Sequence, residues 1–172
     1  MPIGNIDSLM KKLSSVEDVA IEGAKKGMSK TLLRMQKDAK LNAPTADNTL
    51  INSIHIDIRE VEKGIEGRVY TVNDHAIYVE FGTGPVGEQS DKVVPPGVAL
   101  QYKDKGWLVP VQYFPNYESY GMIAIEIKGE LFVPTRGQKA QQFMTPAAKN
   151  SKGKFKNDMS LGIRKELKEL SK

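Results

Sequence analysis

Apolar residues recur along the first forty positions with the spacing of an α-helix. The intervals between them are four or three residues, which places them along one face of a helix of about seven turns. This stripe consists of Val16, Ala20, Ala24, Met28, Leu32, Met35 and Ala39. Ala43-Pro44 ends it, because a residue before proline is pushed out of the helical region. We predict helical structure over residues 8–42.

Capping signals indicate that this region is divided into a short helix and a long one. Asn5 or Asp7 is suited to cap a short helix that carries Leu9, Met10 and Leu13. Ser14-x-x-Glu17 and Ser15-x-x-Asp18 resemble capping boxes, in which a hydroxyl and a carboxylate satisfy the exposed amides of a new helix. The long helix is therefore expected to begin near residue 15.

After residue 50 the period changes to that of a strand. Ile54, Ile56 and Ile58 alternate with polar residues, and Lys63-Gly64 indicates a turn. The segment 65–72 returns as a second strand, which Gly67 interrupts. We predict a hairpin over residues 50–72.

A short helix and a long loop are predicted next. Asn73-Asp74 and Gly82 are suited to cap a helix at 74–82, with Gly82 in the left-handed conformation. Residues 84–105 are predicted to form a loop, because prolines and glycines interrupt both helices and strands there. Loops of such length in compact domains are usually functional or disordered. We expect this loop to be mobile in the isolated protein and ordered on assembly. Its helix and strand breakers are Gly84, Pro85, Gly87, Pro95, Pro96 and Gly97.

Strands are predicted over residues 106–134 and a second long helix over 146–170. The strand region contains a hairpin that turns at Lys128-Gly129. Thr145 is a suitable helix cap, and Pro146 suits the first helical position, where its missing amide costs nothing. The apolar stripe of this helix is Phe155, Met159, Ile163, Leu167 and Leu170.

Strands grouped as hairpins, with helices at either end, indicate an α+β fold. We predict an antiparallel sheet of hairpins packed by a long N-terminal helix and a long C-terminal helix. The 172 residues are enough for one core and few for two, so we predict a single domain over residues 1–172.

Composition narrows the possible functions. The chain is 40% hydrophobic and 27% charged, as in ordinary folded proteins. No run approaches the length of a membrane-spanning helix, and the first residues do not resemble a secretory signal. We therefore expect the protein to act in the compartment where it is made. The absence of cysteine excludes disulfides, thiolate metal sites and a cysteine nucleophile.

The net charge of +4 raises the question of nucleic-acid binding. Much of the surplus lies near the C-terminus, at Lys149, Lys152, Lys154, Lys156, Arg164, Lys165, Lys168 and Lys172. Such a surface could meet DNA phosphates. The alternative is the solvated face of a helix, which we favour because surplus charge bears on solubility more than on fold.

Candidate chemistry is sparse. Gly82 to Gly87 satisfies G-x-G-x-x-G, but Pro85 removes an amide that a phosphate would need, and no strand precedes the motif. His55 and His75 belong to no short-spaced ligand set. Glu80 has no evident partner carboxylate, so we expect it to accept amides of the glycine turn or to pair across a subunit interface. We predict no enzyme activity, no metal and no cofactor.

Three motifs together resemble the tail-completion or neck family of long-tailed bacteriophages, the gene-ten-like morphogenesis proteins. The first motif is Ala43-Pro44 with the segment 50–54. The middle motif, 76–84, reads AIYVEFGTG and is the most specific. The closing motif is 135–138 with Phe143-Met144 and Pro146-Ala147, and Gly106-Trp107 also has a counterpart.

The sequence departs from the family pattern in two places. Asp47-Asn48 stands where the family has threonine and glycine, and asparagine tolerates the left-handed turn better than most residues. Gln142 stands where the family has proline.

The resemblance implies a structural protein that forms a ring, of six subunits, between a head-closure protein and a tail terminator or tail-tube protein. It implies a location in the virion neck, and in the host cytoplasm during assembly, with DNA only as passing cargo and no membrane. The motif residues expected at a subunit interface are Tyr78, Glu80, Phe81, Gly82, Thr83, Gly84, Trp107 and Phe143. The alternative is a basic DNA-binding protein that uses the C-terminal helix.

Overall fold

The structure, a computed structural model, describes residues 4–44, 48–62 and 64–170. The side chains of residues 4, 5, 7–9 and 12 lie outside the description, and with them the predicted caps Asn5 and Asp7 and the apolar Leu9. Lys63 of the predicted turn and Asp47 also lie outside it. The chain divides into two compact units, one formed by residues 1–73 and 143–172 and the other by residues 74–142. The single domain over residues 1–172 stays a prediction.

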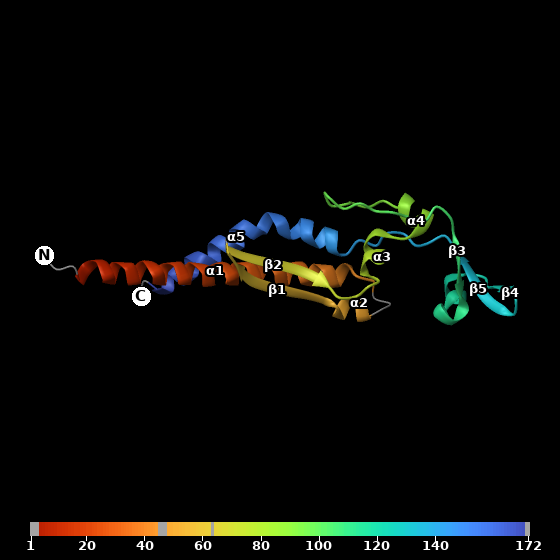
Figure 1. The fold of residues 1–172 in the computed structure, drawn as a ribbon, viewed down its shortest axis with the longest axis horizontal. Coiled ribbons are helices and arrows are strands. Elements are labelled where there is room, and N and C mark those ends of the chain that lie inside the picture. The colour runs from red at the N-terminus through yellow and green to blue at the C-terminus, as the bar shows by residue number, and fades with distance from the viewer. Residues whose placement is uncertain (1–3, 45–47, 63, 171–172) are drawn as a thin grey trace. The chain divides into compact units, whose positions relative to one another are not determined.

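Two long helices, α1 (Gly4–Asn42) and α5 (Met144–Leu170), build the first unit and lie side by side (Figure 1). The predicted division of α1 near Ser14 is wrong, because the helix runs through it unbroken. No proline or glycine interrupts residues 5–22, so nothing forces a new start where the capping boxes occur. Helix α5 begins at Met144, which places Thr145 inside the helix.

Glycines allow the backbones of α1 and α5 to approach closely. A Cβ added at Gly23 would lie 2.6 Å from the Cα of Ile163, and one at Gly27 would lie 2.5 Å from the carbonyl oxygen of Asp158. Gly162 in turn faces the carbonyl oxygen of Gly23. Gly162 weakens α5 by its low helix propensity but is needed for this packing.

The predicted stripe of α5 is only partly buried. Met159, Ile163 and Leu167 are half-buried, whereas Phe155 and Leu170 are exposed. The face that meets α1 is instead built from smaller or polar residues at helical spacing, namely Ala147, Ser151, Asp158 and Gly162. The backbones of the two helices pack so closely that only small side chains fit along this line. The large side chains lie to the side of it.

A hairpin covers another part of α1. Helix α2 (Asn48–Asn52) takes up residues 50–52 of the predicted hairpin, because Asn48 begins a helical turn there. It leads into strands β1 (Ile54–Val61) and β2 (Gly64–Thr71), which pair antiparallel. Gly67 lies opposite Ile58 on the inner face, and a Cβ there would lie 2.7 Å from Leu32 Cδ1 and would also overlap Met28. Gly67 therefore allows the hairpin to approach α1 closely at this position.

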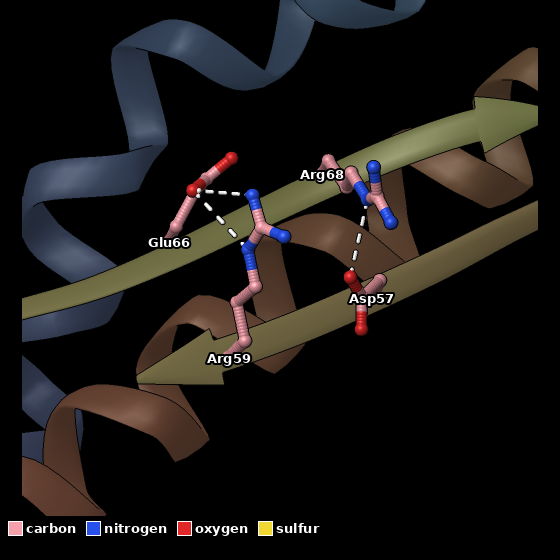
Figure 2. A network of polar contacts seen from close by, with 4 residues as sticks. All are labelled: Asp57, Arg59, Glu66 and Arg68. Atoms are coloured by element: carbon pink, nitrogen blue, oxygen red, sulfur yellow. Dashed lines mark hydrogen bonds and ion pairs between the residues drawn. The ribbon is translucent and has the colours of Figure 1, made fainter. Parts of the chain in front are cut away.

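The outer face of the hairpin is polar. Arg59 donates to Glu66 at 2.9 Å and Arg68 donates to Asp57 at 3.1 Å, in two cross-strand pairs (Figure 2). These pairs are exposed, so each contributes little to stability. They fix the register of a strand whose inner face is apolar.

Asp158 is a buried charge between the two long helices, at 4% exposure. Its carboxylate accepts from Thr31 Oγ1 at 3.0 Å and lies 2.9 Å from Arg34 and 3.1 Å from Lys30. Burial alone would raise the pKa of Asp158, but the hydrogen bonds from Arg34, Lys30 and Thr31 outweigh it and hold that pKa below its ordinary value. This carboxylate is therefore ionised in the folded protein at neutral pH.

The second unit carries two short helices and a small sheet. The helices are α3 (Ala76–Phe81) and α4 (Gly84–Gln89). Strands β3 (Trp107–Pro110), β4 (Ile125–Ile127) and β5 (Glu130–Thr135) form an antiparallel sheet in the order β3-β5-β4. Two 3₁₀ turns, η1 (Val111–Tyr113) and η2 (Tyr117–Tyr120), lie between β3 and β4.

Two local predictions for this unit need correction. The loop predicted at 84–105 begins with α4, because Pro85 suits the first turn of a helix as well as a loop. His75, and not Asn73 or Asp74, occupies the N-cap position of α3. The α+β class is confirmed, with long terminal helices and antiparallel hairpins, although the strands form two sheets.

Candidate functional site

The end of α3 and the start of α4 are joined by a tight glycine turn. Gly82 has φ 76° and ψ 176°, and Gly84 has φ 58°. The positive φ predicted for Gly82 is present, but its ψ lies outside the left-handed helical region, in a region that is essentially restricted to glycine. The turn therefore requires glycine at this position for conformational reasons alone.

The segment 135–141 lies directly beside this turn. Thr83 donates its amide to the carbonyl of Gln138 at 3.0 Å, and Gln138 donates its amide to Thr83 Oγ1 at 3.2 Å. Val86 donates to the carbonyl of Arg136 at 3.3 Å, and Gln141 donates to the carbonyl of Val79 at 2.8 Å. The middle motif and the first part of the closing motif, far apart in sequence, thus form one structure.

Close backbone packing explains the glycine spacing. A Cβ at Gly84 would lie 2.6 Å from the carbonyl oxygen of Arg136 and 2.7 Å from Trp107 Cζ3. One at Gly82 would lie 2.7 Å from the carbonyl oxygen of Gln138, and Gly137 faces the carbonyl oxygen of Thr83. The amides of Thr83, Val86 and Gly87 are donated to the protein's own carbonyls, and a nucleotide phosphate would have to displace them.

Beside the glycine turn lies an open hollow of about 490 Å³, within the size range of small binding sites. Tyr102 donates its hydroxyl to the carbonyl of Phe81 at 2.9 Å, and Lys103 lies over the ring of Trp107 at 5.1 Å. Burial, with Glu88 nearby, raises the pKa of Tyr102, so its hydroxyl stays a donor at neutral pH. The lining is Tyr78, Gly82, Thr83, Gly84, Gln101, Tyr102, Lys103, Trp107 and Gln138. We call it the aromatic hollow.

Residues 7–82 match a phage tail-component family. The family is described as "Bacteriophage HK97-gp10, putative tail-component", and the match covers somewhat less than half of the chain. No curated protein and no solved structure matches. The resemblance is thus confirmed over α1, the hairpin and α3, and it indicates a structural phage protein.

The tail-component match ends at the glycine turn. It includes the first motif and the middle motif up to Gly82. Gly106-Trp107 and the closing motif lie beyond it, so their resemblance to the family stays a prediction. Their contacts with the turn are nevertheless direct, through Trp107 beside Gly84 and Gln138 beside Thr83.

The structure gathers most, but not all, of the motif residues expected at an interface. Tyr78, Gly82, Thr83, Gly84 and Trp107 line the aromatic hollow. Glu80 is buried and Phe81 half-buried, and neither lines it. Phe143 belongs to the first unit, where its side chain is fully buried in the core. Its expected place at a subunit interface stays a prediction, and it would require the buried ring to become accessible on assembly.

Sequence reasoning missed three residues of the hollow, Gln101, Tyr102 and Lys103. They lie in the segment predicted as a loop, where no periodicity marks them. The one available signal was Tyr102, an aromatic residue in an otherwise polar stretch. Gln138 was part of the closing motif, but its contact with Tyr78 was not predicted, and its side-chain amide donates to the carbonyl of Tyr78 at 3.0 Å.

Two side chains anchor the chain where it leaves α4. Lys92 Nζ donates to the carbonyls of Gly87, Glu88 and Ser90 at 2.6, 2.8 and 3.1 Å, which uses all three donors of the ammonium group. The side-chain amide of Gln142 accepts from the amide of Val93 and donates to its carbonyl, at 2.8 and 2.7 Å. The extended segment that follows therefore starts from a fixed point.

The described parts of the chain contain neither a cluster of metal ligands nor a helix suited to span a membrane. Within residues 4–44, 48–62 and 64–170, no group of three or more histidine, cysteine, aspartate or glutamate side chains is placed to hold a metal ion. None of the helices described there is long and apolar enough to cross a membrane. His55 is exposed beside Tyr70, with 5.9 Å between ring centroids.

Proposed function

We propose that the protein is a non-enzymatic structural component of a phage neck. Copies of it, six by the resemblance, form a ring between a head-closure protein and a tail terminator or tail-tube protein. In this proposal the protein resides in the virion neck, assembles in the host cytoplasm, and meets DNA only as passing cargo. The observation that carries the proposal is the match of residues 7–82 to a tail-component family.

Uncovered apolar surfaces support a role in assembly. Near its N-terminus α1 exposes a stripe at helical spacing, formed by Ile6, Met10, Leu13 and Val16. The strand register places Leu108, Ile125 and Ile127 on one face of the small sheet, and all three are exposed. Contiguous apolar surface of this kind usually marks a protein–protein contact. Different patches on one subunit suit heterologous contacts, which close into a ring when the rotation permits.

Gene deletion in the parent phage tests the proposal. We expect DNA-filled heads and complete free tails that fail to join, and we expect joining to be restored when the protein is supplied from a plasmid. Electron microscopy of the lysate distinguishes the outcomes. Normal infectious particles would contradict a structural role, and the loss of tails themselves would place the protein in the tail and not in the neck.

DNA binding through α5 is the second candidate. Its basic side chains at positions 149, 152, 154, 156, 164, 165 and 168 are all exposed. Lysine dominates this set, which fits sequence-independent phosphate contact better than base recognition. A steep fall in duplex affinity between about 50 and 200 mM salt would favour this function. Equal, weak binding at both salt concentrations would leave the neck role as the better account.

A further inference from the structure

An exposed apolar segment with a β-turn at its end projects from the second unit. Between Val93 and Leu100 the chain runs out from α4 and returns toward β3, as Figure 1 shows. The amide of Val98 donates to the carbonyl of Pro95 at 3.2 Å, and Gly97 has φ 83°. Proline at the second position and glycine at the third are the signature of a type II turn. We call residues 93–99 the proline arm.

The proline arm is apolar and largely uncovered. Val93, Val94 and Val98 are 55%, 41% and 41% exposed, and Pro96 and Gly97 are exposed as well. Its base is fixed by the contacts of Lys92 and Gln142, and its tip is closed by the turn. A segment held in shape in this way loses little conformational entropy on binding, so its apolar tip is suited to insertion.

The aromatic hollow has the complementary chemistry. Tyr78 and Trp107, far apart in the sequence, both line it. Several peptide-recognition domains use aromatic-lined grooves of this kind to bind proline-rich segments. The exposed Lys103 contributes a positive charge to the lining, while the exposed Glu88 and Asp91 lie at the base of the arm. An arm that enters the hollow thus brings acidic groups toward a basic one.

The arm cannot readily fill the hollow of its own subunit. Gln101, which already lines the hollow, follows the turn residue Val98 with only Ala99 and Leu100 between them. The three steps from Val98 to Gln101 span at most about 11 Å, and they already lead away from the tip toward the hollow. Insertion in the same subunit would require the chain to reverse within those two residues.

We propose that the proline arm of one copy inserts its Pro95–Val98 turn into the aromatic hollow of the next copy. This inference rests on the proposed ring and names the contact that links its subunits. Each copy carries one arm and one hollow, so the contact is heterologous and repeats around a closed ring. The turn packs on Tyr78 and Trp107, and Asp91 approaches Lys103.

Disulfide trapping tests this contact directly, because the natural chain has no cysteine. Val98→Cys and Tyr78→Cys proteins are purified separately, mixed at a concentration at which the wild type assembles, and oxidised. Only bonds between copies can join the two variants. The matched control pairs Val98→Cys with Ile123→Cys, whose site is 78% exposed and therefore easier to reach by random collision than Tyr78 at 52%.

We expect the 98–78 disulfide to form in several-fold higher yield than the 98–123 disulfide. A yield no higher than the control overturns the inference, as does a predominantly intrachain bond in a Val98→Cys/Tyr78→Cys double variant. The single tryptophan, Trp107, gives a second measurement, since its emission should shift to the blue on assembly of the wild type and not of Pro96→Asp. If trapping fails while general cross-linking still shows a ring, the inference fails and the proposed function stands.

Discussion

At the scale of single residues, the two long helices of the first unit are joined by an ionised carboxylate. Asp158 is surrounded by Thr31, Lys30 and Arg34, which belong to consecutive turns of α1. A buried charge is costly unless it is paired, so this residue stabilises the fold only while all its partners remain. The site is therefore sensitive to both mutation and pH.

Asp158→Asn should lower the free energy of unfolding by about 1–3 kcal/mol at neutral pH, because the amide loses the charge-assisted bonds while Arg34 stays half-buried. Urea unfolding measures the loss. Asp57→Asn is the control, since its pair with Arg68 is exposed and should contribute little. Equal losses in the two variants would contradict the role of burial.

The lowered pKa of Asp158 also predicts a pH dependence. Its contribution is fully present above the ordinary aspartate value of 3.8 and is lost as pH falls through the depressed folded value. The wild type should therefore lose more stability than Asp158→Asn between pH 5 and the acid range below about 3. Parallel pH profiles of the two proteins would show that this carboxylate is not coupled to folding.

Gly84 gives a second residue-scale prediction. Gly84→Ala should destabilise the second unit by about 2 kcal/mol or more, since a positive φ alone costs an alanine about 1–2 kcal/mol and the methyl group would overlap Arg136 and Trp107. Gly121→Ala, also at positive φ but with open space around it, isolates the conformational cost. A changed Trp107 emission in the first variant only would confirm that the difference arises at the aromatic hollow.

At the scale of elements, helix packing and helix propensity act in opposite directions along α5. Gly162→Ala should weaken the α1–α5 contact, because the methyl group would meet the carbonyl oxygen of Gly23. Gly153→Ala, on the same helix with nothing within 4 Å, should raise stability by up to about 1 kcal/mol. Thermal unfolding of the two variants should give shifts of opposite sign. A stabilising effect of both would mean that the helices are not in close backbone contact.

The elements also show which parts of the fold could be predicted. The long helices and the first hairpin follow from local periodicity, so Ala24 to Ala39 and Ile54 to Ile58 were sufficient to identify them. Helix α4 was missed because Gly84, Pro85 and Gly87 are local signals of a loop. The meeting of Thr83 with Gln138 was beyond prediction, since it depends on tertiary packing between segments 55 residues apart.

At the scale of the whole molecule, the segment that follows the proline arm is the expected site of first cleavage in the free protein. Trypsin should cut at Lys103 or Lys105, which are exposed, before Lys92, whose ammonium group is held by three carbonyls. Mass spectrometry of early fragments identifies the site. Assembled rings should resist the cut, because the arm of the next copy then covers the hollow that Lys103 lines. Cleavage at the same rate in both states would mean that the arm takes no part in assembly.

The first unit is completed by the last helix of the chain, and this has a consequence for synthesis. Helix α1 ends at Asn42 and its partner α5 begins at Met144, so roughly a hundred residues must be translated in between. At a translation rate of about 5–20 residues per second, the face of α1 that packs on α5 stays uncovered for roughly 5–20 s. The hairpin β1–β2 emerges much earlier and covers Met28 and Leu32 through Gly67. The order of the elements thus shields part of the nascent helix from aggregation until α5 has been synthesised.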